Sequence, residues 1–174
     1  MKRFNNVIKQ KGFTLIELLG VIVILSIIML IAIPNITSVL EKNKKETYLA
    51  DAKKLITQAE YEIRTGNVEK PNSTDIVKVT LSYLGTNDVN KDPDGNSYSQ
   101  TDSYVVIVRN DGYLEYYVNL VATTDTGNRG IYLTKQDNLQ GDNRLAQVKK
   151  DIEIPDDNKI KEITNKTSAT IKNY

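Results

Sequence analysis

The chain lacks cysteine, histidine and tryptophan, and it has only two phenylalanines and four prolines among 174 residues. Without cysteine it can form no disulfide, no thiolate nucleophile and no cysteine-based zinc site. Without histidine it lacks the usual general base near neutral pH and the commonest metal ligand. An enzyme would have to rely on Asp, Glu, Lys, Ser, Thr and Tyr alone. We therefore expect no catalytic residues, no metal site and no cofactor.

An excess of one charge is also missing. The 23 basic and 22 acidic residues give a net charge of +1. This balance argues against a nucleic-acid-binding protein that depends on a large basic surface, and it leaves room only for a local basic patch. The length predicts one domain, or one domain with an appendage.

Apolar residues are concentrated near the N-terminus. Residues 1–12 carry four basic and no acidic side chains, and residues 13–33 form an apolar run whose single charge is Glu17. As a helix, this run would be about 31 Å long, which matches the hydrocarbon core of a bilayer. Because the basic residues precede the run, we expect the N-terminus to face the cytoplasm.

Two simpler interpretations of the run explain less. A cleaved secretory signal has an apolar run of about 7–15 residues followed by a small-residue cleavage site, and the sequence has neither. A plain signal anchor fits the length but does not explain Glu17, since a carboxylate inside a membrane span costs on the order of 2–3 kcal/mol. Glu17 therefore needs a partner.

The residues around this acid form a dense motif. The class III signal of type IV prepilins and pseudopilins resembles the stretch Lys11-Gly12-Phe13-Thr14-Leu15-Ile16-Glu17-Leu18-Leu19. The resemblance implies that a prepilin peptidase cuts between Gly12 and Phe13 and that the new Phe13 amine is N-methylated. It also implies that Phe13 and Glu17 act in assembly, because Glu17 of an incoming subunit pairs with the Phe13 amine of its neighbour.

Elementary chemistry agrees with this arrangement. Gly12 offers a protease an open backbone without a side chain. Cleavage would create an amine at Phe13, about one helical turn from Glu17. Opposite charges attract strongly in a low dielectric, and each is costly alone. Pairing within one chain remains the alternative to pairing between subunits.

Gly20 and Pro34 are candidate weak points of the helix. Proline cannot donate to the carbonyl four residues before it, so Pro34 is expected to end or bend the helix. Glycine costs about 1 kcal/mol relative to alanine in a helix. Simple tolerance of glycine in a membrane helix is the alternative explanation of Gly20.

Residues 35–65 continue the helical pattern. Gly66 is a plausible helix end. An apolar stripe at spacings of three or four is formed by Tyr48, Ala52, Leu55, Ala59 and Ile63.

The segment that follows is less regular. Residues 72–85 are expected to be helical or irregular, although the run 76–84 also suits a strand. Residues 87–100 are rich in turn formers. Within them, residues 91–98 are similar to the Asp-Pro-x-Gly-Asn-x-Tyr run between helix and sheet in many pilins and pseudopilins. The spacing of Asp92, Asp94 and Asn96 also suggests the start of a calcium loop, but the glycine is one place early and the closing glutamate is missing, so an Asx-rich turn is the preferred interpretation.

Strand signals dominate the C-terminal part. Residues 103–109 and 113–121 alternate and flank Asn110-Asp111-Gly112, a strong hairpin signal. Beyond them the pattern predicts a turn over 123–130, a strand over 131–134, a strand around Ile152 and Ile154, a short helix or turn over 158–165 and a terminal strand over 167–171.

The expected fold class is α+β, with a long N-terminal helix packed against an antiparallel sheet of about four strands, as in the pilin fold. The predicted organisation is a leader (1–12), a transmembrane and assembly helix (13–40) and a soluble head (41–174). The head comprises a helix half (41–65), an αβ loop (66–102) and a sheet region (103–174). By analogy, the missing cysteines suit a Gram-positive type of pilin.

The resemblance implies the major structural subunit of a type IV pilus, which serves adhesion, surface motility or biofilm formation. Its partners would be identical subunits, prepilin peptidase, the membrane assembly platform with its ATPase, and the cytoplasmic membrane before assembly into an extracellular filament. The alternatives are a minor pilin or pseudopilin of a DNA-uptake or secretion system and, from another class, a membrane-anchored enzyme or binding protein.

Overall fold

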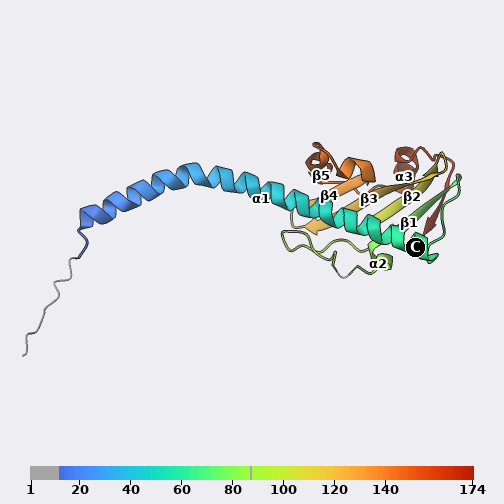
Figure 1. Cartoon of the computed structure of the whole chain (residues 1–174), viewed down its shortest axis with the longest axis horizontal. Helices are drawn as coiled ribbons and strands as arrows, with labels where there is room; N and C mark the ends of the chain where they lie inside the picture. The colour runs from blue at the N-terminus through green and yellow to red at the C-terminus, as the bar shows by residue number, and fades with distance from the viewer. Residues whose placement is uncertain (1–11, 87) are drawn as a thin grey trace, which may run out of the picture. The chain divides into compact units, whose positions relative to one another are not determined.

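The computed structural model describes residues 12–86 and 88–174 (Figure 1). The chain divides into two compact units, Met1–Glu41 and Lys42–Tyr174. The predicted leader, apart from Gly12, and the first residue of the predicted loop, Asn87, lie outside the described residues. The long helix α1 (Leu15–Thr65) begins in the first unit and ends in the second.

The first unit consists of the apolar part of α1. Between residues 12 and 40, every described side chain is exposed except that of Ala32, which is half-buried. Polar side chains in this part bond to the preceding turn: Ser26 Oγ donates to the Ile22 carbonyl at 2.7 Å, Asn35 Nδ2 to the Ile31 carbonyl at 3.2 Å and Ser38 Oγ to the Asn35 carbonyl at 2.9 Å. Within the described part of the chain, α1 is the single helix long and apolar enough to cross a membrane.

The second unit is built on the other half of α1. The predicted stripe from Tyr48 to Ile63 is buried, as expected for an amphipathic helix on a core. The helix ends where predicted: Gly66 has a φ of +81°, and Val68 N–H donates to the Glu62 carbonyl at 3.2 Å.

The sheet has six strands in the order β5-β4-β3-β2-β1-β6. All neighbouring strands are antiparallel except β1 and β6, which are parallel. The α+β class is confirmed, whereas the expected four-stranded antiparallel sheet is a mixed six-stranded one. The elements after α1 are β1 (Asp75–Thr80), α2 (Leu81–Leu84), β2 (Tyr104–Asn110), β3 (Tyr113–Thr124), β4 (Gly127–Lys135), η1 (Gln136–Leu139), η2 (Arg144–Gln147), β5 (Val148–Lys150), α3 (Asp157–Ile163) and β6 (Thr170–Asn173).

The preference for helix or irregular structure over residues 72–85 was wrong for β1. This strand lies between β2 and β6, and Ile76, Val77 and Val79 are all buried. Its ladder partners are residues 104–108 and 170–173, which are distant in the sequence. Helical structure is limited to the four residues of α2, where Thr80 Oγ1 accepts from Tyr83 N–H at 3.3 Å.

The predicted hairpin between β2 and β3 is confirmed, and Asp111 and Gly112 both have positive φ angles in its turn. The next hairpin is longer than predicted, because β3 and β4 pair out to Thr124 and Gly127. The strand expected around Ile152 and Ile154 was wrong: β5 ends at Lys150, and Asp151, with a φ of +53°, redirects the chain.

Apolar side chains cover both faces of the sheet. On one face α1 and α2 pack against Val77, Val79, Val105 and Ile107. On the other face Ile160 of α3 packs with Ile76, Tyr104, Val106 and Val108. Because a strand buried on both faces needs no alternation, the run from Tyr104 to Val108 is continuously buried.

Backbone hydrogen bonds hold the C-terminal strand β6 in place. Tyr174 N–H donates to the Lys78 carbonyl at 2.9 Å, and Thr80 N–H donates to the Tyr174 carbonyl at 3.0 Å. The Tyr174 ring meets the Tyr83 ring edge-on at 5.8 Å between centroids. These contacts fix β6 beside β1.

A Gly130→Ala substitution is expected to destabilise the second unit by about 3 kcal/mol or more, through overlap and backbone strain. Gly130 has a φ of +156°, and an added Cβ would lie 1.8 Å from the Leu120 carbonyl oxygen of the adjacent strand. Gly66→Ala is the control, because a Cβ there meets no atom within 4 Å and the positive φ alone costs about 1–2 kcal/mol.

The measurement is urea unfolding of the full-length chain in detergent, followed by near-ultraviolet circular dichroism. All ten tyrosines lie at residue 48 or beyond, and there is no tryptophan, so most of this signal reports on the second unit. Equal stability of the two variants would contradict the close approach of β3 and β4 at Gly130.

Candidate assembly site at the start of the long helix

The predicted cleavage and assembly residues lie at the start of α1. Gly12, Phe13 and Thr14 precede the helix, which begins at Leu15. The Phe13 side chain is 88% exposed. In the uncut chain the Phe13 nitrogen is a peptide nitrogen, so the amine that the motif implies exists only after cleavage.

Glu17 is bonded to Thr14 in a reciprocal capping arrangement. Its Oε2 atom accepts from Thr14 N–H at 2.8 Å and from the Thr14 hydroxyl at 2.8 Å, and Glu17 N–H donates to Thr14 Oγ1 at 3.3 Å. This is a capping box, in which residues at the first and fourth positions satisfy each other's backbone groups at a helix start. Thr14 is therefore the partner of Glu17 within one chain.

The cap leaves the carboxylate able to accept a further donor. The Thr14 backbone N–H and the Thr14 hydroxyl both donate to Oε2, and a carboxylate has about four acceptor positions in all. A cation that approaches Oε1 would not have to displace Thr14. The arrangement can thus hold the acid in one orientation and still bind an amine.

The role of Thr14 was not predicted, although the sequence contains a signal for it. Thr14-Leu15-Ile16-Glu17 has the Thr-x-x-Glu spacing that precedes an apolar helical run. The expected partner of Glu17 was the Phe13 amine, either of the neighbouring subunit or of the same chain. The structure adds a local partner three residues away.

Gly20 and Pro34 both lie inside α1. The helix continues through them, so neither residue ends it, and a bend at either position stays a prediction. An alanine Cβ at Gly20 would meet no atom within 4 Å. Close packing in one copy of the chain therefore gives no reason for glycine at this position.

The loop that resembled a calcium site is organised by hydrogen bonds. Asp92 is 5% exposed, and its Oδ1 accepts from Asp94 N–H at 2.9 Å and Asn96 N–H at 2.8 Å. Its Oδ2 accepts from the Tyr48 hydroxyl at 2.7 Å and from Asn96 Nδ2 at 3.0 Å. Asp94 is paired with Lys44 and lies 3.3 Å from Arg129. These contacts are those of an Asx-rich turn, and residues 12–86 and 88–174 contain no group of three or more acidic side chains placed to hold a metal ion.

Comparison with known proteins gives one match. Residues 8–33 match the family model described as the prokaryotic N-terminal methylation motif. No curated protein and no solved structure matches the chain significantly. The matched residues include Gly12, Phe13 and Glu17, and they end one residue before Pro34.

The matched motif is the class III signal of type IV pilins and pseudopilins. It implies processing by prepilin peptidase and assembly into a filament or a membrane machinery. Together with the single apolar N-terminal helix it fits anchoring in the membrane before assembly. The chain therefore carries, at residues 8–33, the N-terminal methylation motif of a type IV pilin-like or pseudopilin protein.

Proposed function

We propose that this chain is the major structural subunit of a type IV pilus, and that its role is mechanical rather than catalytic. The observation that carries the proposal is the methylation motif on a helix whose apolar half has exposed side chains at every described position except Ala32. Exposed side chains of this kind, from Phe13 to Leu40, need lipid or other copies of the same helix.

The proposed mechanism has two steps. The processed chain is held in the cytoplasmic membrane by α1, with the N-terminus facing the cytoplasm. A membrane platform with its ATPase then moves it into an extracellular filament, where Glu17 pairs with the Phe13 amine of the neighbouring subunit and sets the axial register. The filament serves adhesion, surface motility or biofilm formation.

The mature protein is expected to begin at an N-methylated Phe13. Cleavage at Gly12 removes the basic leader and leaves the apolar helix in the membrane. Intact-mass and N-terminal peptide mass spectrometry of the chain purified from its own host tests this directly. A chain that still begins at Met1, or one cut after Ala32 as a secretory signal would be, would refute the proposal.

The same preparation separates a major subunit from a minor one. Filaments sheared from the cell surface should contain this chain as their dominant protein. If it is processed at Phe13 but forms only a trace component, it is a minor pilin or a pseudopilin.

A further inference from the structure

A segment with exposed acidic side chains leads from β5 into the first residue of α3. We call residues 151–157 the acidic segment; it holds four acidic and no basic side chains. At its centre the Ile154 side chain is 46% exposed. Among the described residues of the second unit, the other exposed large apolar side chains are the tyrosines Tyr61, Tyr83 and Tyr113. Ile154 is therefore an aliphatic side chain on the surface, flanked by negative charge.

An open groove of about 640 Å³ lies between α1 and residues 84–86, 88 and 89. We call it the α1–α2 groove. Its lining is apolar at Ala50 and Leu84 and carries the two lysines Lys53 and Lys54 from α1. Lys53 and Lys54 are both exposed, and Lys54 Nζ lies 3.2 Å from the Asp51 carboxylate. One acidic residue, Asp88, also lines the groove.

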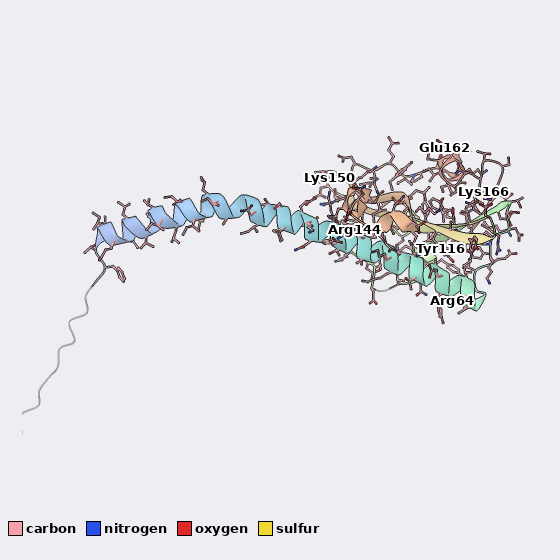
Figure 2. The ribbon with its side chains drawn as sticks, turned by 45° about the horizontal axis from the view of Figure 1, so that its top comes forward. Arg64, Tyr116, Arg144, Lys150, Glu162 and Lys166 are labelled. Atoms are coloured by element: carbon pink, nitrogen blue, oxygen red, sulfur yellow. The ribbon has the colours of Figure 1, made fainter. Side chains whose placement is uncertain are left out.

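The groove and the acidic segment lie on opposite sides of the sheet. Leu84 of α2 belongs to the core on the α1 face, whereas Ile160 of α3 belongs to the core on the other face. Figure 1 shows α2 and α3 on opposite sides of the sheet, and in Figure 2 Lys150 and Glu162, near the two ends of the segment, lie on the side away from Arg64 of α1. The segment of one molecule therefore does not face its own groove.

We propose that the α1–α2 groove of one copy binds the acidic segment of a second copy. Ile154 then lies against Ala50 and Leu84, with its acidic neighbours beside Lys53 and Lys54. Lys150, just before the segment, supplies the opposite charge for Asp88. The inference rests on the proposed function and assigns the contact between neighbouring heads in the filament.

This contact is heterologous, because two different surfaces meet. An assembly of any length has one unoccupied groove at one end and one unbound acidic segment at the other. Further copies can therefore add through the same contact. Repetition of such a contact generates an open helical assembly, whereas a self-complementary contact stops at a dimer. The lysines of the groove and the acids of the segment select the partner and its orientation, and Ile154 adds buried apolar area.

Disulfide trapping tests the contact in a background without cysteine. The full-length Lys53→Cys, Glu153→Cys double variant is expressed in the host, and its sheared filaments are oxidised. Both positions are exposed. We expect a ladder of covalent multimers on non-reducing gels. The matched control is the Lys53→Cys, Asp142→Cys double variant, in which the second cysteine stands at an exposed acid between η1 and η2. This variant should give no ladder.

Charge exchange gives a second, independent readout. Lys53→Glu and Glu153→Lys should each lower the mass of sheared filaments about tenfold, because each brings like charges together at the contact. The chain with both substitutions restores the opposite charges and should recover most of the filament mass. Processing at Phe13 is unchanged in all three variants.

The outcomes separate this inference from the proposed function. Suppose that the wild-type chain forms filaments but the cysteine pair gives no ladder, or the chain with exchanged charges does not recover filament mass. Either result overturns the contact and leaves the pilus assignment intact. A covalent dimer from Lys53→Cys alone indicates a symmetric contact and also overturns it. If the wild-type chain forms no filaments at all, both the contact and the proposed function fail.

Discussion

Replacing Glu17 by alanine is expected to leave leader removal intact and to reduce surface filaments more than tenfold. Cleavage occurs five residues away, so Gly12 and Phe13 remain available to the peptidase. The substitution removes a cost on the order of 2–3 kcal/mol for an acid inside the bilayer. It also leaves the Phe13 amine of the neighbouring subunit unpaired in the filament. Both effects favour the membrane pool over the filament.

The capping box supplies the control variants. Glu17→Gln keeps a side chain that can cap from the fourth position but removes the charge. Thr14→Ala keeps the charge but removes the side-chain cap, which costs about 1 kcal/mol at the helix start. If charge pairing drives assembly, Glu17→Gln should fail like the alanine variant, whereas Thr14→Ala should retain filaments.

Quantitative immunoblotting of sheared filaments and of the membrane fraction measures the distribution of each variant. Wild-type amounts of filament from Glu17→Gln would show that capping is what Glu17 contributes. Wild-type amounts from Glu17→Ala would remove Glu17 from the mechanism altogether. The fraction of chain cut at Phe13 serves as the control in every case.

Replacing Asp92 by alanine is expected to destabilise the second unit by about 3 kcal/mol or more. Asp92 is buried and accepts hydrogen bonds from Tyr48, Asp94 and Asn96, which tie the loop after α2 to α1. The bond from Tyr48 is buried and those from Asp94 and Asn96 are partly buried, and a buried donor left without an acceptor costs about 1–3 kcal/mol. Tyr48→Phe removes one of these bonds and should cost about 1 kcal/mol. Urea unfolding of the full-length chain, followed by the tyrosine signal, provides both values.

The same residue makes stability depend on pH. Burial by itself raises the pKa of Asp92, but hydrogen bonds from Asn96, Tyr48 and Asp94 outweigh burial and hold that pKa below its usual value. A carboxyl group whose pKa is lower in the folded than in the unfolded state stabilises the fold. This stabilisation is fully present above the unfolded-state pKa of about 3.9 and is lost as pH falls through the lower folded-state pKa. We therefore expect the unfolding midpoint to decrease below about pH 4.

An Asp92→Asn variant should show a smaller decrease over the same range. The decrease will not vanish, because hydrogen bonds from Arg144 and Lys135 also lower the pKa of Glu46 and Glu115, respectively. If wild type and Asp92→Asn lose stability equally between pH 5 and pH 3, Asp92 does not titrate as the structure indicates. The measurement needs the same detergent and ionic strength at every pH.

Local patterns account for the parts that were predicted correctly. The length and hydropathy of residues 13–33, the stripe from Tyr48 to Ile63 and the hairpin at Asp111 and Gly112 each depend on neighbours within a few residues. Helical and turn hydrogen bonds are made over the same short distances. The end of α1 at Gly66 follows for the same reason. The capping box of Thr14 and Glu17 was equally local and was overlooked.

The parts that were predicted wrongly depend on distant partners. The strand β1 exists because β2 and β6 lie on either side of it, and β5 exists because Val148 lies opposite Ile131. Strand hydrogen bonds come from residues remote in the sequence, so short apolar runs do not reveal which of them pair. Burial of both sheet faces likewise required α3 to fold across the second face.

The amino-acid sequence alone was enough to predict the long apolar N-terminal helix, its methylation motif and the α+β class, because those features repeat or bond within one or two turns of chain. Tertiary structure alone decided the six-stranded order, the close backbone approach at Gly130 and the opposite placement of the α1–α2 groove and the acidic segment. Those features arise only when segments ten or more residues apart are brought together by packing.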